Sequence, residues 1–218
     1  MMSEDEDMIF DHMRKGYHQG FLTRKMLLAD PIQQVQQWLK DAMAGGSLEP
    51  NAMTLATASR DGVVSSRMVL LKRLDAQGFL FFTNYESAKA RDLAVNKHVG
   101  LTFWWKEVER QVCLQGEAEK VDREVSEEYF ASRGRESQLA AWASEQSKEI
   151  EGREYLDDKY ADFERKFEGK EIECPENWGG YLVKPSRMEF WQGRSGRMHD
   201  RFVYVKEGEA WRIGRLAP

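Results

Sequence analysis

Residues 53–84 read MTLATASRDGVVSSRMVLLKRLDAQGFLFFTN, and this stretch decides the fold class. Three β-rich runs, 54–58, 63–74 and 79–84, are separated by short turns that contain Asp61-Gly62 and Gln77-Gly78. An Asp-Gly or Gln-Gly turn between apolar runs is typical of an antiparallel hairpin. The stretch therefore predicts consecutive antiparallel strands.

Further strand-like and helix-like runs follow along the chain. The strand pattern returns over 99–105, 110–121, 181–183, 188–191, 202–206 and 210–215. Helices are expected over 31–44, 87–96, 122–133, 137–144 and 153–167. Because strands and helices do not alternate throughout, an antiparallel barrel is favoured over a doubly wound parallel sheet. We expect a mainly β fold of the α+β class, with helices around an antiparallel barrel.

The helix expected over 31–44 carries a signal at each end. Asp30 can cap its first turn, and Pro31 suits the first helical position. Apolar residues such as Val35 and Trp38 then recur at helical spacing until Gly45-Gly46. The pattern predicts an amphipathic helix with one face in the core.

Length and composition limit the classes of function. The chain has 218 residues, of which 41% are hydrophobic, enough for a sizeable core without disulfides or a metal. No linker divides it, so we expect one domain over 21–218 preceded by a flexible leader over 1–20. The 32 basic and 37 acidic residues leave a net charge of −5, which disfavours broad binding to nucleic acid or anionic membrane.

The cysteines and the N-terminus bear on the compartment. Cys113 and Cys174 are too far apart for a CxxC pair and too few for a disulfide framework, which fits a reducing compartment. The first seven residues, MMSEDED, are acidic, and no apolar run approaches the length of a membrane span. We expect a cytoplasmic enzyme or binding protein.

Two segments early in the sheet carry cations. Arg67 and Lys72 stand at the ends of an apolar strand, and their spacing of five predicts opposite faces. Ser87 and Lys89 lie at a helix start, where backbone donors and the helix dipole favour an anion such as phosphate. Solvated strand ends and a capped surface helix are the structural alternatives.

A third segment pairs hydroxyls with a guanidinium. Tyr129, Arg133 and Ser137 recur every four residues, so they share one side if the helix continues past Gly134. Such groups suit a phosphate monoester. The alternative is that Tyr129 lies at the edge of the core.

The densest cluster of functional residue types is at 189–201, which reads EFWQGRSGRMHDR. If this segment is extended, Arg197, His199 and Arg201 share one face, which suits an anionic ligand. Trp191 could pack on a planar group. We expect no metal site, because the four histidines show no ligand spacing.

Several motifs together resemble the pyridoxine/pyridoxamine 5′-phosphate oxidase family, over about residues 13–218. They are RMVLLK at 67–72, FTN at 82–84, ERQV at 109–112, WGG at 178–180, EFWQG at 189–193, RMHDR at 197–201 and RLAP at 215–218. The resemblance implies an antiparallel split β-barrel with surrounding helices. It also implies a homodimer, with FMN bound in a cleft between the subunits.

The resemblance also implies roles for individual residues. The implied FMN contacts are Arg67, Met68, Val69, Leu70, Leu71, Lys72, Phe82, Thr83, Lys89, Gln111, Gln146, Ser147, Trp191 and Arg201. The implied substrate contacts are Lys72, Tyr129, Arg133, Ser137, Arg197 and His199, with Arg14 and Tyr17 of the leader folding over the site as a lid. Arg197 and His199 would orient the substrate at the reacting carbon and are the expected catalytic pair.

The chain departs from the family at two places. The family commonly has Ser-Arg-Lys where this chain has Ser87-Ala88-Lys89, and Gly16 in the leader can loosen the lid. Arg91 lies one helical turn beyond Ala88, so we hypothesise that it replaces the missing FMN-phosphate contact. The alternative is that Arg91 is solvated and that Arg67, Lys89 and backbone donors suffice.

The implied function is an FMN-dependent oxidase that converts pyridoxamine or pyridoxine 5′-phosphate to pyridoxal 5′-phosphate and reduces dioxygen to hydrogen peroxide. One alternative is a carrier or sensor that holds FMN or pyridoxal phosphate without turnover. Another is an FMN reductase that uses a nicotinamide. Arg197 and His199 favour the oxidase, because a flavin carrier needs no second anion clamp beside the ring.

Overall fold

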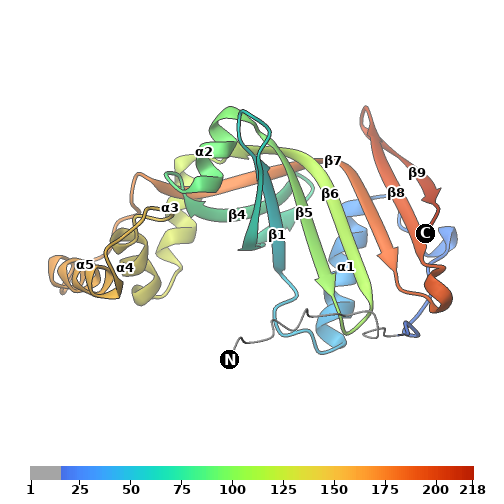
Figure 1. Ribbon diagram of the computed structural model, residues 1–218, viewed down its shortest axis with the longest axis horizontal. Helices are drawn as coiled ribbons and strands as arrows, with labels where there is room; N and C mark the ends of the chain where they lie inside the picture. Colours follow the sequence, from blue (N-terminus) through green and yellow to red (C-terminus); the bar gives the residue numbers. More distant parts are fainter. Residues whose placement is uncertain (1–15) are drawn as a thin grey trace, which may run out of the picture.

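The computed structural model describes residues 16–218, and its centre is one antiparallel sheet. The strands described are β1 (Ala52–Ala58), β2 (Val64–Leu70), β3 (Arg73–Asp75), β4 (Gly78–Asn84), β5 (His98–Trp105), β6 (Arg110–Lys120), β7 (Trp178–Gln192), β8 (Asp200–Glu207) and β9 (Ala210–Leu216). Their order is β2-β1-β5-β6-β7-β4-β3, and β8 and β9 continue from the second half of β7 (Figure 1). The expected mainly β, antiparallel fold class is confirmed.

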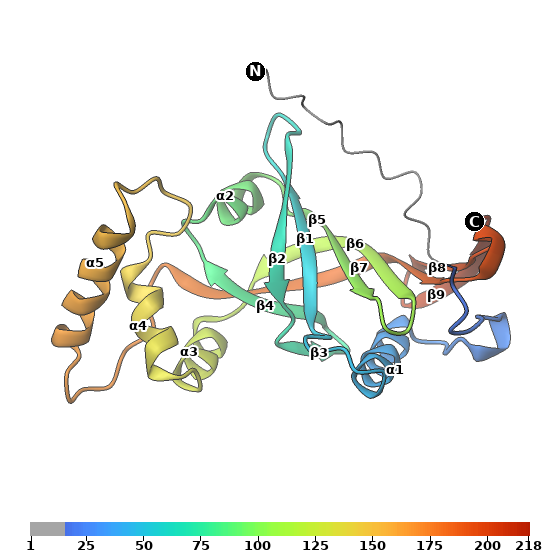
Figure 2. The same ribbon diagram turned by 60° about the horizontal axis from the view of Figure 1, so that its bottom comes forward.

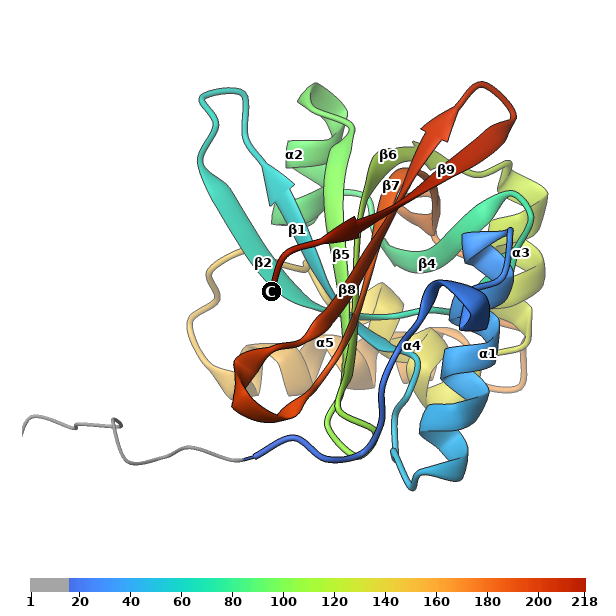
Figure 3. The ribbon, with the colours of Figure 1, turned by 90° about the vertical axis from the view of Figure 1, so that its right-hand side faces the viewer.

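The run expected as one strand over 63–74 is two strands, because the chain changes partner inside it. β2 pairs with β1, whereas β3 pairs with β4 at the other end of the sheet order. The change occurs at two residues: Leu71 N–H donates to the Asn51 carbonyl and Lys72 N–H to the Leu80 carbonyl. A two-residue link between the two ends of the order requires the sheet to curl. The curl is visible in the view along the long axis (Figure 3).

The strands expected at 181–183 and 188–191 are parts of the single long strand β7. Its first half pairs with β4 and its second half with β8, while β6 runs along its length. The gap between the two expected strands contains Pro185, and proline removes a ladder donor. The structure accommodates Pro185 with a register shift at Gln115/Gly116 on β6. A Cβ at Gly116 would lie 2.3 Å from the Lys184 carbonyl oxygen, so this close approach needs glycine.

The five expected α-helices are present, at slightly different bounds: α1 (Pro31–Ala44), α2 (Ala88–Val95), α3 (Arg123–Ala131), α4 (Arg135–Ala143) and α5 (Arg153–Lys166). Two 3₁₀ turns, η1 (Arg24–Met26) and η2 (Ser195–Arg197), add to them. The Asp30 carboxylate accepts a hydrogen bond from Ile32 N–H at 2.8 Å, as the capping signal predicts. Helices α3 to α5 gather at one end of the molecule, and β8 and β9 lie at the other (Figure 2).

The hydrophobic core has two clusters. The larger lies between the sheet and α1, where Trp38 packs edge-on against Phe190 and Trp105 at 5.1 and 6.4 Å between ring centroids. The smaller joins α3, α4 and α5 to the start of β7 around Phe130, Leu139 and Trp178. The smaller cluster anchors the helical end against the sheet. No helix in residues 16–218 has the length and apolar character needed to cross a membrane.

Candidate functional site

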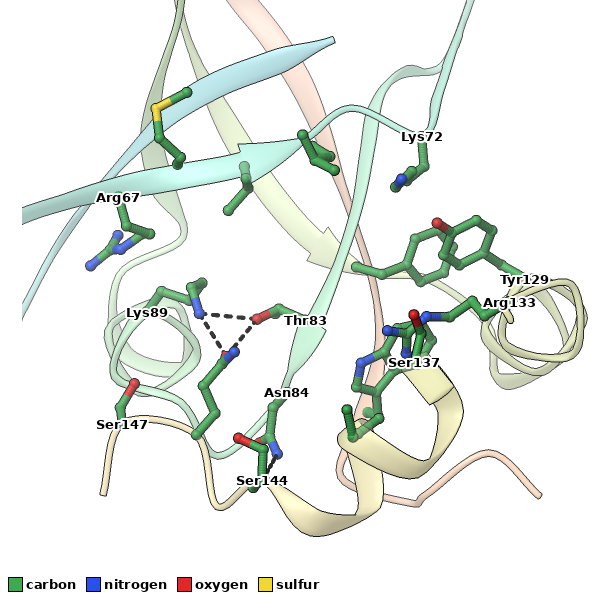
Figure 4. Close-up of a pocket in the computed structure, with 18 of the residues that line it drawn as sticks. Arg67, Lys72, Thr83, Asn84, Lys89, Tyr129, Arg133, Ser137, Ser144 and Ser147 are labelled. Carbon is green, nitrogen blue, oxygen red and sulfur yellow. Dashed lines mark hydrogen bonds between the residues drawn. The ribbon is translucent and has the colours of Figure 1, made fainter. Parts of the chain in front are cut away.

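A pocket of about 930 Å³ lies between β2, β4, α2 and the α3–α4 pair (Figure 4). It brings together thirteen of the expected site residues. They are Arg67, Met68, Val69, Leu70, Lys72, Phe82, Thr83, Lys89, Tyr129, Arg133, Ser137, Gln146 and Ser147. Four of these are cations, and no carboxylate is among the lining residues, so the pocket suits an anionic ligand.

One cationic end of the pocket is built around Arg67 on β2. Its guanidinium donates to the Thr57 hydroxyl at 2.7 Å and to the Ser65 hydroxyl at 2.5 Å. Both hydroxyls in turn donate to the Asp92 carboxylate, at 2.6 and 3.2 Å. Burial lowers the pKa of Arg67, and the Asp92 charge opposes that shift. The two hydroxyls therefore orient a guanidinium that carries no direct carboxylate hydrogen bond among those described.

Lys89 of α2 lies at the same end. Its ammonium group is buried and donates to Thr83 Oγ1 at 3.1 Å, Ser87 Oγ at 3.2 Å and Gln146 Oε1 at 2.8 Å (Figure 4). Burial lowers the pKa of Lys89 to about 8, with a further contribution from the charge of Arg67. All three acceptors are neutral, so a ligand phosphate would supply the missing counter-charge.

The other cationic end lies beside α3 and α4. Arg133 places its guanidinium 4.8 Å from the Trp178 ring centroid, and its Nη1 is buried with no hydrogen-bond partner among the described residues. Burial lowers the pKa of Arg133. An unsatisfied buried donor is costly, so a ligand acceptor at this point would stabilise it. The Lys72 ammonium lies 5.9 Å from the Tyr129 ring centroid at the same end.

The geometry corrects two expectations about how these side chains converge. Tyr129 and Ser137 do not share one helix, because α3 ends at Ala131 and α4 starts after Gly134. They meet because the turn that holds Arg133 folds the two helices around the pocket. Arg67 and Lys72 are not on opposite faces either, because β2 ends at Leu70 and the chain bends before Lys72.

Two other expected residues lie away from the pocket lining. Leu71 is buried in the main core. Arg91 is exposed, and its Nη1 donates to the Glu86 carbonyl at 2.6 Å, whereas Ala88 itself lines the pocket. The compensation hypothesis for Arg91 therefore remains a prediction without a contact to support it.

Three further expected residues, Gln111, Trp191 and Arg201, form a cross-strand row with Trp104 at the far end of the sheet. Trp104 pairs with Gln111, Gln111 with Trp191, and Trp191 with Arg201, so the four side chains share one face. The Tyr17 ring packs edge-on against Trp191 at 5.5 Å and against His199 at 5.6 Å. We call these residues, with Arg197, the aromatic cluster.

Sequence reasoning missed Trp104, which is 46% exposed while its neighbour Trp105 is buried. The signal was available. Adjacent residues of a strand point to opposite faces, so a Trp-Trp pair must place one ring outside the core. Trp104 lies 5.9 Å from Trp191, which makes it part of the same exposed face.

The 197–201 segment is not extended as expected. Arg197 has φ +61° at the end of the η2 turn, and only Arg201 lies within β8. His199 Nδ1 accepts a hydrogen bond from Arg194 N–H at 3.1 Å, so Nε2, which has no hydrogen bond within the part of the chain that the structure describes, is the ring nitrogen that can meet a ligand. Partial burial lowers the pKa of His199, and the charges of Arg197 and Arg201 lower it further. The Arg201 guanidinium is paired with Glu189 at 2.8 Å.

The two groups lie far apart within one chain. Trp178, which lines the pocket, starts β7, and Trp191 of the aromatic cluster is near its end. At about 3.3 Å per residue, these thirteen steps correspond to roughly 40 Å along the strand. None of the aromatic cluster lines the pocket. Arg14 lies outside the described residues.

Two models of known protein families match this chain. The model described as pyridoxamine 5′-phosphate oxidase matches residues 39–166. The model described as the pyridoxine 5′-phosphate oxidase C-terminal dimerisation region matches residues 178–218. Together they cover most of the chain.

Curated relatives and solved structures agree with these matches. The pyridoxine/pyridoxamine 5′-phosphate oxidase of Teredinibacter turnerae is 51% identical over 97% of this chain and 100% of its own length. The enzyme of the same name from Rubrobacter xylanophilus is 48% identical, over 94% of this chain and 95% of its own length. The crystal structure of PhzG from Burkholderia lata 383, in complex with tetrahydrophenazine-1-carboxylic acid, has a TM-score of 0.85 at 30% identity and covers 90% of this chain and 98% of its own.

A second solved structure shares the fold alone. It is a pyridoxamine 5′-phosphate oxidase-related, FMN-binding protein from Nostoc punctiforme, with a TM-score of 0.70 at 16% identity. It covers 88% of this chain and 100% of its own.

Proposed function

The chain belongs to the pyridoxine/pyridoxamine 5′-phosphate oxidase family, and from this premise we propose that it is an FMN-dependent oxidase of pyridoxamine and pyridoxine 5′-phosphates. The products are pyridoxal 5′-phosphate and hydrogen peroxide, with ammonia from the amine substrate. The observation that carries the proposal is one pocket with two cationic ends and a buried Arg133 Nη1 that finds no acceptor within residues 16–218. FMN and its substrate each bring one phosphate, so two anion sites in a single pocket match this pair.

The residues at the Arg67 end fit the phosphate of FMN. Arg67 and Lys89 supply two charges, and Thr83 and Ser147 add hydroxyls to the same lining. The β2 segment Met68–Leu70 provides a wall along which a flat ring system can lie. When bound, FMN supplies the redox chemistry, accepting a hydride from the substrate and passing electrons to dioxygen.

The residues at the Arg133 end fit the phosphate of the substrate. Lys72, Tyr129, Arg133 and Ser137 present two cations and two hydroxyls to one region of the pocket. Fixing a phosphate away from the reacting carbon still lowers the barrier, because it holds the ring in the reactive orientation. Arg197 and His199 would orient the substrate ring near that carbon.

These last two residues would come from the partner subunit. The C-terminal dimerisation region at 178–218 supports a homodimer. The same region carries Trp191, Arg197, His199 and Arg201. We propose that the aromatic cluster of each chain completes the pocket of the other, because it is too distant from the pocket of its own chain.

The two alternative functions differ in what they require. A carrier or sensor that holds FMN or pyridoxal phosphate needs no arrangement that brings substrate and flavin together. A nicotinamide-dependent FMN reductase binds a dinucleotide whose anion is a pyrophosphate between two nucleosides, not a single phosphate monoester beside the flavin. The two cationic ends favour the oxidase, because its cofactor and its substrate each carry one phosphate.

One assay tests the proposal. The purified protein should be yellow, release FMN and not FAD on denaturation, and form aldehyde and peroxide when pyridoxamine 5′-phosphate is added in air. Arg197→Ala should lower turnover while FMN stays bound. A protein that binds FMN but forms neither product would indicate the carrier, and rapid NADH oxidation without pyridoxamine 5′-phosphate would indicate the reductase.

A further inference from the structure

Residues 16–22, which we call the leader strap, are tied to the sheet by a buried carboxylate. Glu109 is 2% exposed and lies in the turn between β5 and β6, with φ +53°. Its Oε2 accepts hydrogen bonds from the backbone N–H groups of His18 at 2.8 Å and Gln19 at 2.9 Å. Glu109 belongs to the ERQV motif, and neither the pocket nor the aromatic cluster assigns it a role.

A second buried carboxylate holds the other end of the strap. Asp200, at the start of β8, is 5% exposed, and its Oδ2 accepts from Leu22 N–H at 3.0 Å and from the Arg194 guanidinium at 3.1 Å. Its Oδ1 accepts from Arg215 on β9. Burial acts to raise the pKa of Asp200, but the Leu22 hydrogen bond and the two arginines lower it overall, so the carboxylate is charged at neutral pH. The Leu22 side chain is buried in the core.

The strap so held places one ring on the aromatic cluster. A Cβ at Gly193 would lie 2.8 Å from Tyr17 Cγ, so the Tyr17 ring rests directly on the glycine backbone. From there the ring meets Trp191 and His199 edge-on. Tyr17 is one residue from the first anchored amide, so movement of the strap at Glu109 would move the ring.

We propose that Glu109 and Asp200 are positioning residues that dock the leader strap before substrate binds, so that Tyr17 already covers His199 and Trp191. The effect on substrate rests on the proposed function, since it assumes that the substrate ring lies beside His199. A docked strap loses little conformational entropy on binding, whereas a free strap would lose it at that moment and weaken affinity. Loss of the anchors should therefore raise KM and leave kcat and FMN binding nearly unchanged.

Hydrogen exchange of the strap measures docking directly. We compare the wild-type holoenzyme with Glu109→Gln, Asp200→Asn and the double variant, following a peptide that contains residues 18–22. Loss of charged acceptors should speed exchange of these amides by about fivefold or more in the double variant. Asp162→Asn, on exposed α5 with its side chain 64% exposed, changes net charge by the same amount as each single variant and should leave exchange of the strap unchanged.

Steady-state kinetics on the same proteins measure the consequence. KM for pyridoxamine 5′-phosphate should rise about threefold or more in the double variant, with kcat and flavin content within about twofold of wild type, since the chemistry is untouched. Unchanged exchange would overturn the docking role. Faster exchange with unchanged KM would overturn the link to substrate. A wild-type protein without oxidase activity would refute the proposed function, while exchange would still decide the docking.

Gly193→Ala provides a second variant that leaves both carboxylates in place. The added methyl must displace the Tyr17 side chain, because two ring atoms lie 2.8 and 2.9 Å from its position and Tyr17 Cβ lies 3.0 Å from it. We expect the same rise in KM. Hydrogen exchange at the His18 and Gln19 amides should, however, be slower than in the double variant, because both carboxylates still accept their hydrogen bonds. This pattern separates placement of the ring from anchoring of the strap. An unchanged KM in Gly193→Ala would contradict the role given to the Tyr17 ring.

Discussion

The cations of the pocket are held by neutral groups. Arg67 rests on two hydroxyls, Lys89 on two hydroxyls and an amide oxygen, and Arg133 has a buried nitrogen with no partner among residues 16–218. Burial lowers the pKa of all three. No carboxylate lines the pocket to neutralise these cations. In their protonated form they can therefore pair with an anionic ligand.

FMN affinity should weaken as pH rises through about 8, the value to which burial lowers the pKa of Lys89. Phosphate binds the protonated amine, so the contribution of Lys89 is fully present below that pH and is lost above it. The dissociation constant should rise by up to about tenfold per pH unit between pH 8 and 9.5. Flavin fluorescence titrations of the apoprotein measure it. In Lys89→Met the profile over this interval should be flat; an equally steep profile would show that another group titrates.

Substitutions at Ala88 and Arg91 test how the FMN phosphate is held. Ala88 lines the pocket, while Arg91 already donates to the Glu86 carbonyl. We expect Arg91→Ala to change the FMN dissociation constant by less than about twofold, under ~0.5 kcal/mol. Ala88→Arg should tighten it about tenfold, the effect of one added charged hydrogen bond. A large loss in Arg91→Ala that Ala88→Arg restores would instead support the compensation hypothesis.

At the scale of elements, the site depends on where strands and helices end. β2 ends at Leu70, so the next two residues can cross to β3 and bring Lys72 to the pocket. α3 and α4 are separated by a short turn, so that Arg133 lies between them and not on either helix. Away from the site, α1 packs its apolar face against the sheet in the main core. The first turn of α1 is capped by the side chain of Asp30.

Removing that cap should destabilise the fold. Asp30→Ala loses the hydrogen bond to Ile32 N–H and a negative charge at the helix N-terminus, and we expect the free energy of unfolding to fall by about 1 kcal/mol. Urea unfolding followed by circular dichroism measures it. Asp30→Asn keeps a capping oxygen and should recover most of the loss. Equal losses in both variants would mean that the cap is not the source of the effect.

At the scale of the whole molecule, β7 separates two groups of residues that the proposed reaction would need together. Its fifteen residues run from the pocket at Trp178 to the aromatic cluster at Trp191. A second chain is the simplest way to bring the groups together, and the dimerisation region covers this strand. Each dimer would then hold two sites, each made from both chains.

Mixed dimers test this arrangement. Arg133→Ala damages the pocket and Arg197→Ala damages the aromatic cluster, so a heterodimer of the two should contain one intact site. Refolding equal amounts together should restore about a quarter of wild-type activity, because half of randomly formed dimers are mixed and each has one good site of two. The matched control pairs Arg133→Ala with Lys72→Ala, both in the pocket, and should restore nothing. No recovery in the first pair would place the whole site within one chain.

The sequence by itself determined the elements and the residue types of the site. Alternation and Gly turns marked the strands, Asp30 and Gly45 bounded α1, and motifs between residues 67 and 218 indicated the family. These signals are local, since they depend on neighbours a few residues away. They also explain the differences from the structure: the polar segment around Pro185 divided β7 into two expected strands, and a spacing of four would align Tyr129 with Ser137 only if one helix continued past Gly134.

Only the tertiary structure decided which of these residues meet. The curl of the sheet brings Lys72 beside Tyr129, and long-range packing leaves Arg133 Nη1 buried without a partner among the described residues. It also divides the expected site into two distant groups and ties the leader strap to Glu109 and Asp200, some 90 and 178 residues away in sequence. Such contacts depend on how the whole chain packs, because burial and partner choice are properties of the folded surface and not of any local pattern.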